Sequence, residues 1–313
     1  MRQLVYTRDT DENIFKAGKK GLHSPNREYM ESLKDELMEA YADYHQKMDT
    51  GCLHQLSGKW EVDFLAPENE RDATEKKRQF VHDLYKSNRP IVKNHKKDIL
   101  DRNHCETIVC PICGIDTYDD WDHYVPRESM PEFSVLTSNL IPLCHDCNSD
   151  KGTLWLNDEQ DYRLIFNAFV DTVPNVPIVT CTLIIDDVLN YPYVRIDVNP
   201  ALRADVPAEN IILTTIEKLG LIDKYQNEAD KAVKKMIQAL SDRLTVRMQY
   251  GEVDRLELLR EEKAVWRQHL QSPNTWNFLE LQIYEELSKP EALTDWFENW
   301  GDGYCFTNNR SQQ

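Results

Sequence analysis

The chain of 313 residues lacks any apolar run long enough to cross a lipid bilayer. Its longest apolar candidate, residues 176–185, has only the length of a β-strand. The first residues also lack the long apolar core of a secretory signal. We therefore expect a cytoplasmic protein with no membrane partner. Internal repeats and low-complexity tracts are missing too, which excludes a repeat architecture, and a hydrophobic content of 41% favours ordinary packed domains.

Basic side chains are in deficit. The chain has 37 lysines and arginines against 54 aspartates and glutamates, a net charge of −17, which argues against a simple nucleic-acid-coating protein. The deficit is uneven, because residues 1–104 are balanced, whereas residues 105–156 and 157–313 are acidic. Residues 76–102 carry nine basic and only three acidic side chains. An acidic protein still binds a polyanion if one face is basic and metal ions cover the reaction centre, or if a partner supplies part of the surface.

The pattern of apolar residues predicts an α+β protein in three parts. Ser24 and Pro25 suit the start of a helix that runs to about residue 48, and further helices are expected at 71–86 and 91–101. We also expect a helix at 162–170, a strand pair near 178–198, and helices from 207 to about 300. The predicted parts are a helical region 1–104, a small core 105–156, and a mostly helical region 157–313.

Four of the eight cysteines form two close pairs, and each pair has two residues between its cysteines. The pairs are Cys110 with Cys113 and Cys144 with Cys147. Two such pairs supply the four thiolates of a structural zinc site, which leaves no coordination position open for water. The 30 residues between the pairs exceed the ~15–20 of common zinc ribbons, so a folded segment is expected between them. The alternative is four core cysteines that pair by chance.

A candidate reaction centre lies between and beside these pairs. Hydrolysis of a phosphodiester needs a base for water and a cation for the phosphate. His123 is the candidate base, and Asp122 and Asn148 offer the oxygen ligands that a hard cation prefers. Adjacent residues of a regular strand face opposite sides, so the site is expected where a strand opens into a loop. Lys151, one helical turn after Asn148, is expected to contact a phosphate oxygen.

Residues 110–155 resemble the HNH endonucleases, the ββα-metal nucleases. The motifs that carry the resemblance are C-P-I-C-G at 110–114, D-W-D-H-Y-V-P at 120–126 and N-L-I-P-L-C-H-D-C-N-S-D-K-G at 139–152. The resemblance implies a bent two-stranded ribbon followed by a helix around one Mg²⁺ or Mn²⁺ ion. It makes Asp122 and Asn148 metal ligands, His123 the general base, and Asn139 the residue that holds the histidine ring. The cysteine pairs match the zinc-bearing branch, whereas residues 127–138 lack the glycine pair common in the family.

A second, looser resemblance lies outside this core. Residues 207–221 read P-A-E-N-I-I-L-T-T-I-E-K-L-G-L. They are similar to the C-terminal region of HNH proteins from bacterial anti-phage loci, which include nuclease subunits paired with an ABC-type ATPase in Septu-like systems, some of them attached to retrons. This resemblance implies a nuclease of antiviral defence that acts with an ATPase partner.

The nucleic-acid surface is expected on the basic segment 76–102 and beside the core. Its expected contacts are Lys93, Lys96, Lys97, Arg127 and Lys151. The alternative for the segment is a solvated helix face. The sequence does not choose between DNA and RNA as substrate. The alternative to a nuclease is a non-catalytic zinc-knotted adaptor that binds nucleic acid or protein.

Overall fold

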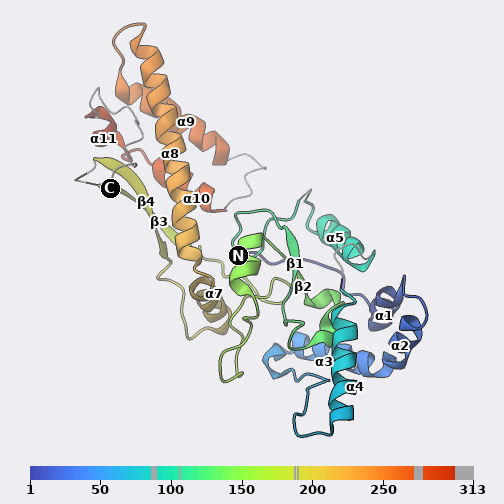
Figure 1. Cartoon of the computed structure of the whole chain (residues 1–313). Helices are drawn as coiled ribbons and strands as arrows, with labels where there is room; N and C mark the ends of the chain where they lie inside the picture. The colour runs from blue at the N-terminus through green and yellow to red at the C-terminus, as the bar shows by residue number, and fades with distance from the viewer. Residues whose placement is uncertain (86–89, 106, 187, 189, 271–277, 300–313) are drawn as a thin grey trace, which may run out of the picture. The chain divides into compact units, whose positions relative to one another are not determined.

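The computed structural model describes residues 1–85, 90–105, 107–186, 188, 190–270 and 278–299. Helices and two small antiparallel sheets make the protein α+β, which confirms the predicted class (Figure 1). Across these residues no helix combines the length and the apolar character needed to cross a membrane. Residues 86–89 of the basic segment, and the ends of two predicted helices at Trp276 and Trp300, lie outside the described residues.

The chain forms two compact units. The first contains residues 1–178 and 200–221, and the second contains residues 179–199 and 222–313. The sequence predicts three parts, which were defined by motifs and composition. The two units are defined by compactness, so the three-part division stays a prediction.

Helices make up the N-terminal part of the first unit. They are α1 (Asp11–Lys19), α2 (Asn26–Ser32), α3 (Lys34–Asp49), α4 (Glu68–His82) and α5 (Pro90–Arg102). Helix α1 was not expected from the sequence. The Thr10 hydroxyl caps it by accepting a hydrogen bond from the Asn13 N–H, and its buried face contains Ile14 and Phe15. The single helix expected near 24–48 is instead two helices that meet at Leu33.

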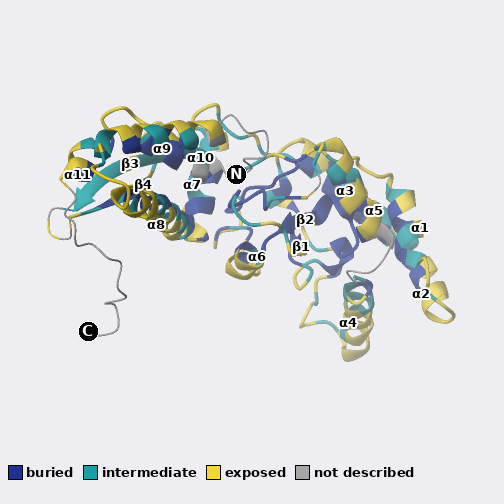
Figure 2. Ribbon diagram, turned by 90° about the horizontal axis from the view of Figure 1, so that it is seen from above, coloured by how far each residue is buried: buried dark blue, intermediate teal, exposed yellow. Residues whose placement is uncertain are grey.

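A two-stranded ribbon and a short helix form the centre of this unit. Strand β1 (Asp120–His123) pairs antiparallel with β2 (Leu140–Leu143), so that Asp122 lies opposite Ile141. Helix α6 (His145–Lys151) follows and ends at Gly152, whose positive φ of 46° suits glycine. The connection between the strands contains the 3-10 turns η2 (Pro131–Phe133) and η3 (Thr137–Asn139) and is mostly buried (Figure 2).

Helix α5 packs on the ribbon, and a later helix supports the segment that follows α6. The His95 imidazole of α5 hydrogen-bonds the Leu140 carbonyl at 3.1 Å and lies 4.9 Å from the buried Trp121 ring. Helix α7 (Pro207–Lys218) holds residues 164–166, because the Thr215 hydroxyl accepts from the Phe166 N–H at 2.8 Å. The helix expected at 162–170 does not form. The backbone of this segment forms hydrogen bonds with neighbouring segments instead. For example, the Leu164 N–H donates to the Trp155 carbonyl.

The second unit is a strand pair with helices. The strand pair expected near 178–198 is confirmed as β3 (Val179–Asp186) and β4 (Tyr191–Val198), which run antiparallel. The helices are α8 (Leu221–Met248), α9 (Arg255–Leu270), α10 (Phe278–Leu287) and α11 (Thr294–Glu298). Gln226 of α8 fixes β4 by donating to the Val194 carbonyl and accepting from the Ile196 N–H.

The buried His95 predicts an acid-sensitive packing of α5 on the ribbon. Burial lowers the pKa of His95 to about 4, although its bond to the Leu140 carbonyl acts in the opposite direction. In the unfolded chain His95 is protonated below pH ~6.5, whereas in the folded chain it stays neutral down to pH ~4. Because the unfolded state binds this extra proton, the free energy of unfolding falls by about 2 kcal/mol between pH ~7 and ~5.

His95→Gln removes this titration and keeps a donor for the Leu140 carbonyl. We expect the variant to lose about 2 kcal/mol less than the unsubstituted protein over that pH interval, as measured by urea unfolding. Identical pH dependence of the two proteins would contradict the assignment.

Candidate functional site

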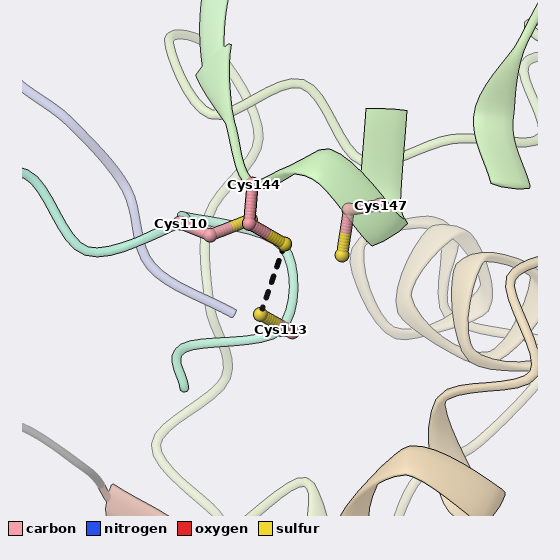
Figure 3. A group of neighbouring side chains, drawn as sticks. All are labelled: Cys110, Cys113, Cys144 and Cys147. Atoms are coloured by element: carbon pink, nitrogen blue, oxygen red, sulfur yellow. Dashed lines mark hydrogen bonds between the residues drawn. The ribbon is translucent and has the colours of Figure 1, made fainter. Parts of the chain in front are cut away.

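The four paired cysteines come together in one buried cluster (Figure 3). All four sulfur atoms lie within 4.8 Å of one another, and the Sγ atoms of Cys113 and Cys144 are 3.8 Å apart. A tetrahedral zinc site with Zn–S bonds of about 2.3 Å places its sulfurs about 3.8 Å apart. The four thiols therefore fit zinc, which confirms that the two pairs act together and not as scattered core cysteines.

The backbone around each cysteine pair explains this convergence. After the first pair, Gly114 takes a φ of 70°, and its N–H donates to the Cys110 carbonyl at 2.9 Å. The Ile115 N–H donates to the Cys113 sulfur at 3.5 Å, which favours a thiolate there. In the second pair, Cys144 precedes α6 and Cys147 lies in its first turn. The cluster thus ties the turn at 110–114 to the junction of β2 and α6.

Asp122 forms a buried ion pair across the core. Its side chain and that of Lys151 are 9% and 1% exposed, and the Lys151 Nζ lies 2.8 Å from the Asp122 Oδ2. That oxygen is fully buried, and its partner among the described residues is the Lys151 ammonium. Burial raises the pKa of Asp122 to about 6, against the opposing pull of the Lys151 ammonium.

The His123 ring is oriented by the loop that follows β1. Its Nε2 lies 2.9 Å from the Ser134 carbonyl oxygen, which only accepts, so Nε2 carries the proton of the neutral ring. The Nδ1 atom then keeps its lone pair. Burial lowers the pKa of His123 to about 4, although the bond to Ser134 acts in the opposite direction, and the ring is therefore neutral near pH 7. The Tyr85 ring packs edge-on against it at 4.5 Å.

Asn139 holds the loop rather than the histidine ring. Its side chain accepts from the Val125 N–H at 2.8 Å and donates to the Val125 carbonyl at 3.0 Å. The resemblance to HNH enzymes implied that Asn139 contacts the His123 ring. In the structure the ring hydrogen-bonds the Ser134 carbonyl instead. Asn139 is fully buried, and the Tyr44 hydroxyl of α3 donates to its Oδ1 at 3.2 Å.

Asn148 lies on α6 in a half-buried position. It precedes Lys151 by three residues, so the two side chains occupy the same face of the helix. Helix α6 packs against β1, and Lys151 reaches Asp122 from that face. Asn148 thus lies on α6 about one turn before the lysine that contacts Asp122.

Side chains from the helical region support the loop between the strands, and sequence reasoning missed this role. Arg78 of α4 donates to the carbonyls of Glu128 and Ser129. The buried Glu132 accepts from the Lys59 N–H. Arg78 belongs to the basic segment 76–102 and was grouped with residues for nucleic acid. A lone arginine in a charged helix gives no sequence signal of a structural partner 50 residues away.

The expected nucleic-acid contacts divide into two groups. Lys93, Lys96 and Lys97 are exposed on α5, and Lys96 lies over the Tyr118 ring at 5.1 Å. Arg127 is half-buried with its guanidinium over the Tyr85 ring at 5.6 Å, close to His123. Lys151 differs from the expectation, because it is buried in the ion pair with Asp122 and is not exposed to a phosphate in this structure.

Two curated proteins share short regions with the chain. Protein ea31 of Escherichia phage lambda is 46% identical over 52 residues, which are 16% of this chain and 18% of that protein. Septu protein PtuB of Bacillus thuringiensis is 30% identical over 76 residues, 24% of this chain and 28% of that protein. The chain thus matches less than a third of the length of either relative. No family model and no solved structure match it.

The cysteine cluster predicts that the protein binds one zinc ion per chain. Cys113→Ser is expected to remove the bound zinc and to lower the melting temperature by many degrees, because zinc binding to such sites contributes about 10 kcal/mol or more. Metal analysis and calorimetry provide the two measurements. Cys52→Ser, a change at a half-buried cysteine outside the cluster, is the matched control and is expected to keep the zinc. Equal zinc content in the two variants would contradict the assignment.

Proposed function

We propose that the protein is a divalent-metal-dependent endonuclease of the HNH type, which hydrolyses phosphodiester bonds of DNA or RNA. One observation carries the proposal. Asp122 places a buried carboxylate, paired with the Lys151 ammonium, next in the chain to His123, whose Nδ1 keeps its lone pair because Nε2 faces the Ser134 carbonyl. A buried carboxylate and a neutral base on adjacent residues supply the oxygen ligand and the proton acceptor that metal-assisted hydrolysis requires.

The donor atoms fit a hard cation. Asp122 and Asn148 offer carboxylate and amide oxygens from β1 and α6, the ligand types that Mg²⁺ and Mn²⁺ prefer. Such an ion supplies Lewis-acid stabilisation of charge on the phosphate when it is bound. The cysteine cluster serves a different purpose, since four thiolates saturate a zinc ion and leave no position for water.

The chain's own residues prepare the proton transfer. Ser134 fixes the tautomer of His123, so Nδ1 is the atom that accepts a proton from water. The Asn139 side chain hydrogen-bonds both the N–H and the carbonyl of Val125, which follows His123 by two residues. These bonds hold the backbone next to the imidazole. Tyr44 supports Asn139 from α3. His123 is thus a base of fixed orientation, with a low pKa that keeps it unprotonated at neutral pH.

A role in anti-phage defence with an ABC-type ATPase as partner forms the wider part of the proposal. The short similarity to Septu protein PtuB supports it, as does the resemblance of residues 207–221 to nuclease subunits of Septu-like systems. The net charge of −17 also favours a partner that contributes to the nucleic-acid surface.

Replacement of the base tests the nuclease proposal. We expect His123→Ala to lower the cleavage rate by about 10²–10⁴-fold, because general-base assistance is lost, while zinc content stays unchanged. The melting temperature should fall by some degrees, since the ring is buried and bonded to the Ser134 carbonyl. Purified protein is assayed on double-stranded DNA, single-stranded DNA and tRNA with Mg²⁺ or Mn²⁺, with and without the products of its neighbouring genes.

His145→Ala is the matched control, since His145 is an exposed histidine of the same core. If His123→Ala cleaves at the native rate, His123 is not the base. If the native protein shows no cleavage under any of these conditions yet binds nucleic acid or the ATPase, the zinc-knotted adaptor is the better description.

The exposed lysines of α5 give a second prediction. Replacing Lys93, Lys96 and Lys97 together by alanine is expected to weaken nucleic-acid binding similarly for all sequences. The slope of log affinity against log salt should fall by about 0.9 for each lost phosphate contact on a duplex. Fluorescence anisotropy across a salt series measures both effects. Alanine at Lys231, Lys234 and Lys235, three exposed lysines of α8, gives the same change in net charge and should leave the slope unaltered.

A further inference from the structure

Lys151 makes two contacts that join α6 to the candidate reaction centre. Its ammonium lies 2.8 Å from the Asp122 carboxylate and donates to the His123 carbonyl at 3.0 Å. The side chain is 1% exposed, so water contributes little to solvating this charge. A buried ammonium in this position stabilises the Asp122 carboxylate and also joins the backbone of β1 to α6.

This ion pair changes the charge that an incoming metal ion meets. The charges of Asp122 and Lys151 cancel, and the amide of Asn148 is neutral. The other acidic groups whose fields reach Asp122 belong to Asp120 and Glu128, and both residues are exposed and screened by solvent. The buried pair therefore has no net negative charge to attract a divalent cation. The positive charge of Lys151 also repels a cation that approaches the Asp122 carboxylate. Repulsion between like charges is strong where the surroundings are poorly polarisable.

We propose that Lys151 is an internal counter-ion of Asp122 that keeps the divalent-metal affinity of the free protein low, so that the metal binds tightly only together with the phosphate of a nucleic acid. The inference rests on the proposed nuclease function and deepens it. The phosphodiester brings the negative charge that the Asp122–Lys151 pair lacks. Metal and nucleic acid then strengthen each other's binding by the same factor, as thermodynamic linkage requires. The lysine that the sequence suggested as a phosphate contact acts instead on the metal ligand.

Mn²⁺ binding to the zinc-loaded protein tests the inference without any cleavage. Free Mn²⁺ is measured by electron paramagnetic resonance in a titration of the native protein, Lys151→Met and Lys234→Met. Methionine at 151 keeps the length of the side chain and removes its charge, and Lys234 is an exposed lysine of α8 that serves as the matched control. We expect Lys151→Met to bind Mn²⁺ at least about ten-fold more tightly than the native protein, because repulsion by the ammonium is gone. Lys234→Met should equal the native protein.

A second titration measures the coupling and does not depend on whether Lys151→Met folds. His123→Ala, which lacks the base, is titrated with Mn²⁺ in the presence and absence of a short DNA duplex and an RNA hairpin. We expect at least one of the two nucleic acids to tighten Mn²⁺ binding by about ten-fold or more. The same comparison in a Lys151→Met, His123→Ala double variant should show a smaller gain.

The outcomes separate the inference from the function it rests on. Equal Mn²⁺ affinity of Lys151→Met and the native protein, or weaker binding by the variant, would overturn the counter-ion role while the cleavage results still stood. Equal Mn²⁺ affinity of His123→Ala with and without either nucleic acid would overturn the coupling. Absence of Mn²⁺ binding in every variant, with and without nucleic acid, would instead count against the metal-dependent nuclease itself.

Discussion

The convergence of four buried thiols is the constraint on which the candidate site depends. Helix α6 has only seven residues, too few to be stable by itself in water. It is fixed because Cys144 and Cys147, at its start, share a cluster with the turn at 110–114. Asn148 and Lys151 follow on the same short helix, so their positions relative to β1 derive from the thiol cluster. A structural zinc ion therefore fits a role in aligning groups it never touches.

Local chemistry made part of this structure predictable. Cysteine spacing and the glycine after the first pair identified the thiol cluster, because metal-binding turns use a short, recognisable segment. The β-branched apolar run at 178–185 and the alternation at 193–198 are also local signals, and they predicted β3 and β4. Features that depend on partners far away in the sequence were not predictable. The segment 162–170 has the apolar content of a helix, yet Thr215 and Trp155 satisfy its backbone. Lys151 looked like a surface cation because no sequence pattern reveals that its partner is Asp122.

The helical N-terminal region is part of the core's architecture and not merely a flank. The loop from β1 to β2 is long and mostly buried, and it lacks the glycine pair expected from the HNH family. Buried backbone groups need partners, and Tyr44 and Arg78 supply some of them from α3 and α4. The loop that orients His123 through Ser134 therefore depends on side chains of helices that come much earlier in the chain than β1. Changes in those helices would therefore alter the position of the His123 ring.

Charge distribution connects the surface of the protein with its centre. A net charge of −17 repels nucleic acid at long range, and this repulsion is screened beyond about 10 Å at ordinary ionic strength. At shorter range the exposed lysines of α5 dominate, and α5 contacts the ribbon directly through His95. In the same unit, Asp122 and Lys151 neutralise each other. An acidic protein with a neutral reaction centre has little attraction for either metal or nucleic acid alone. Under the proposed nuclease function, activity would then require both to arrive together, because neither is strongly attracted alone.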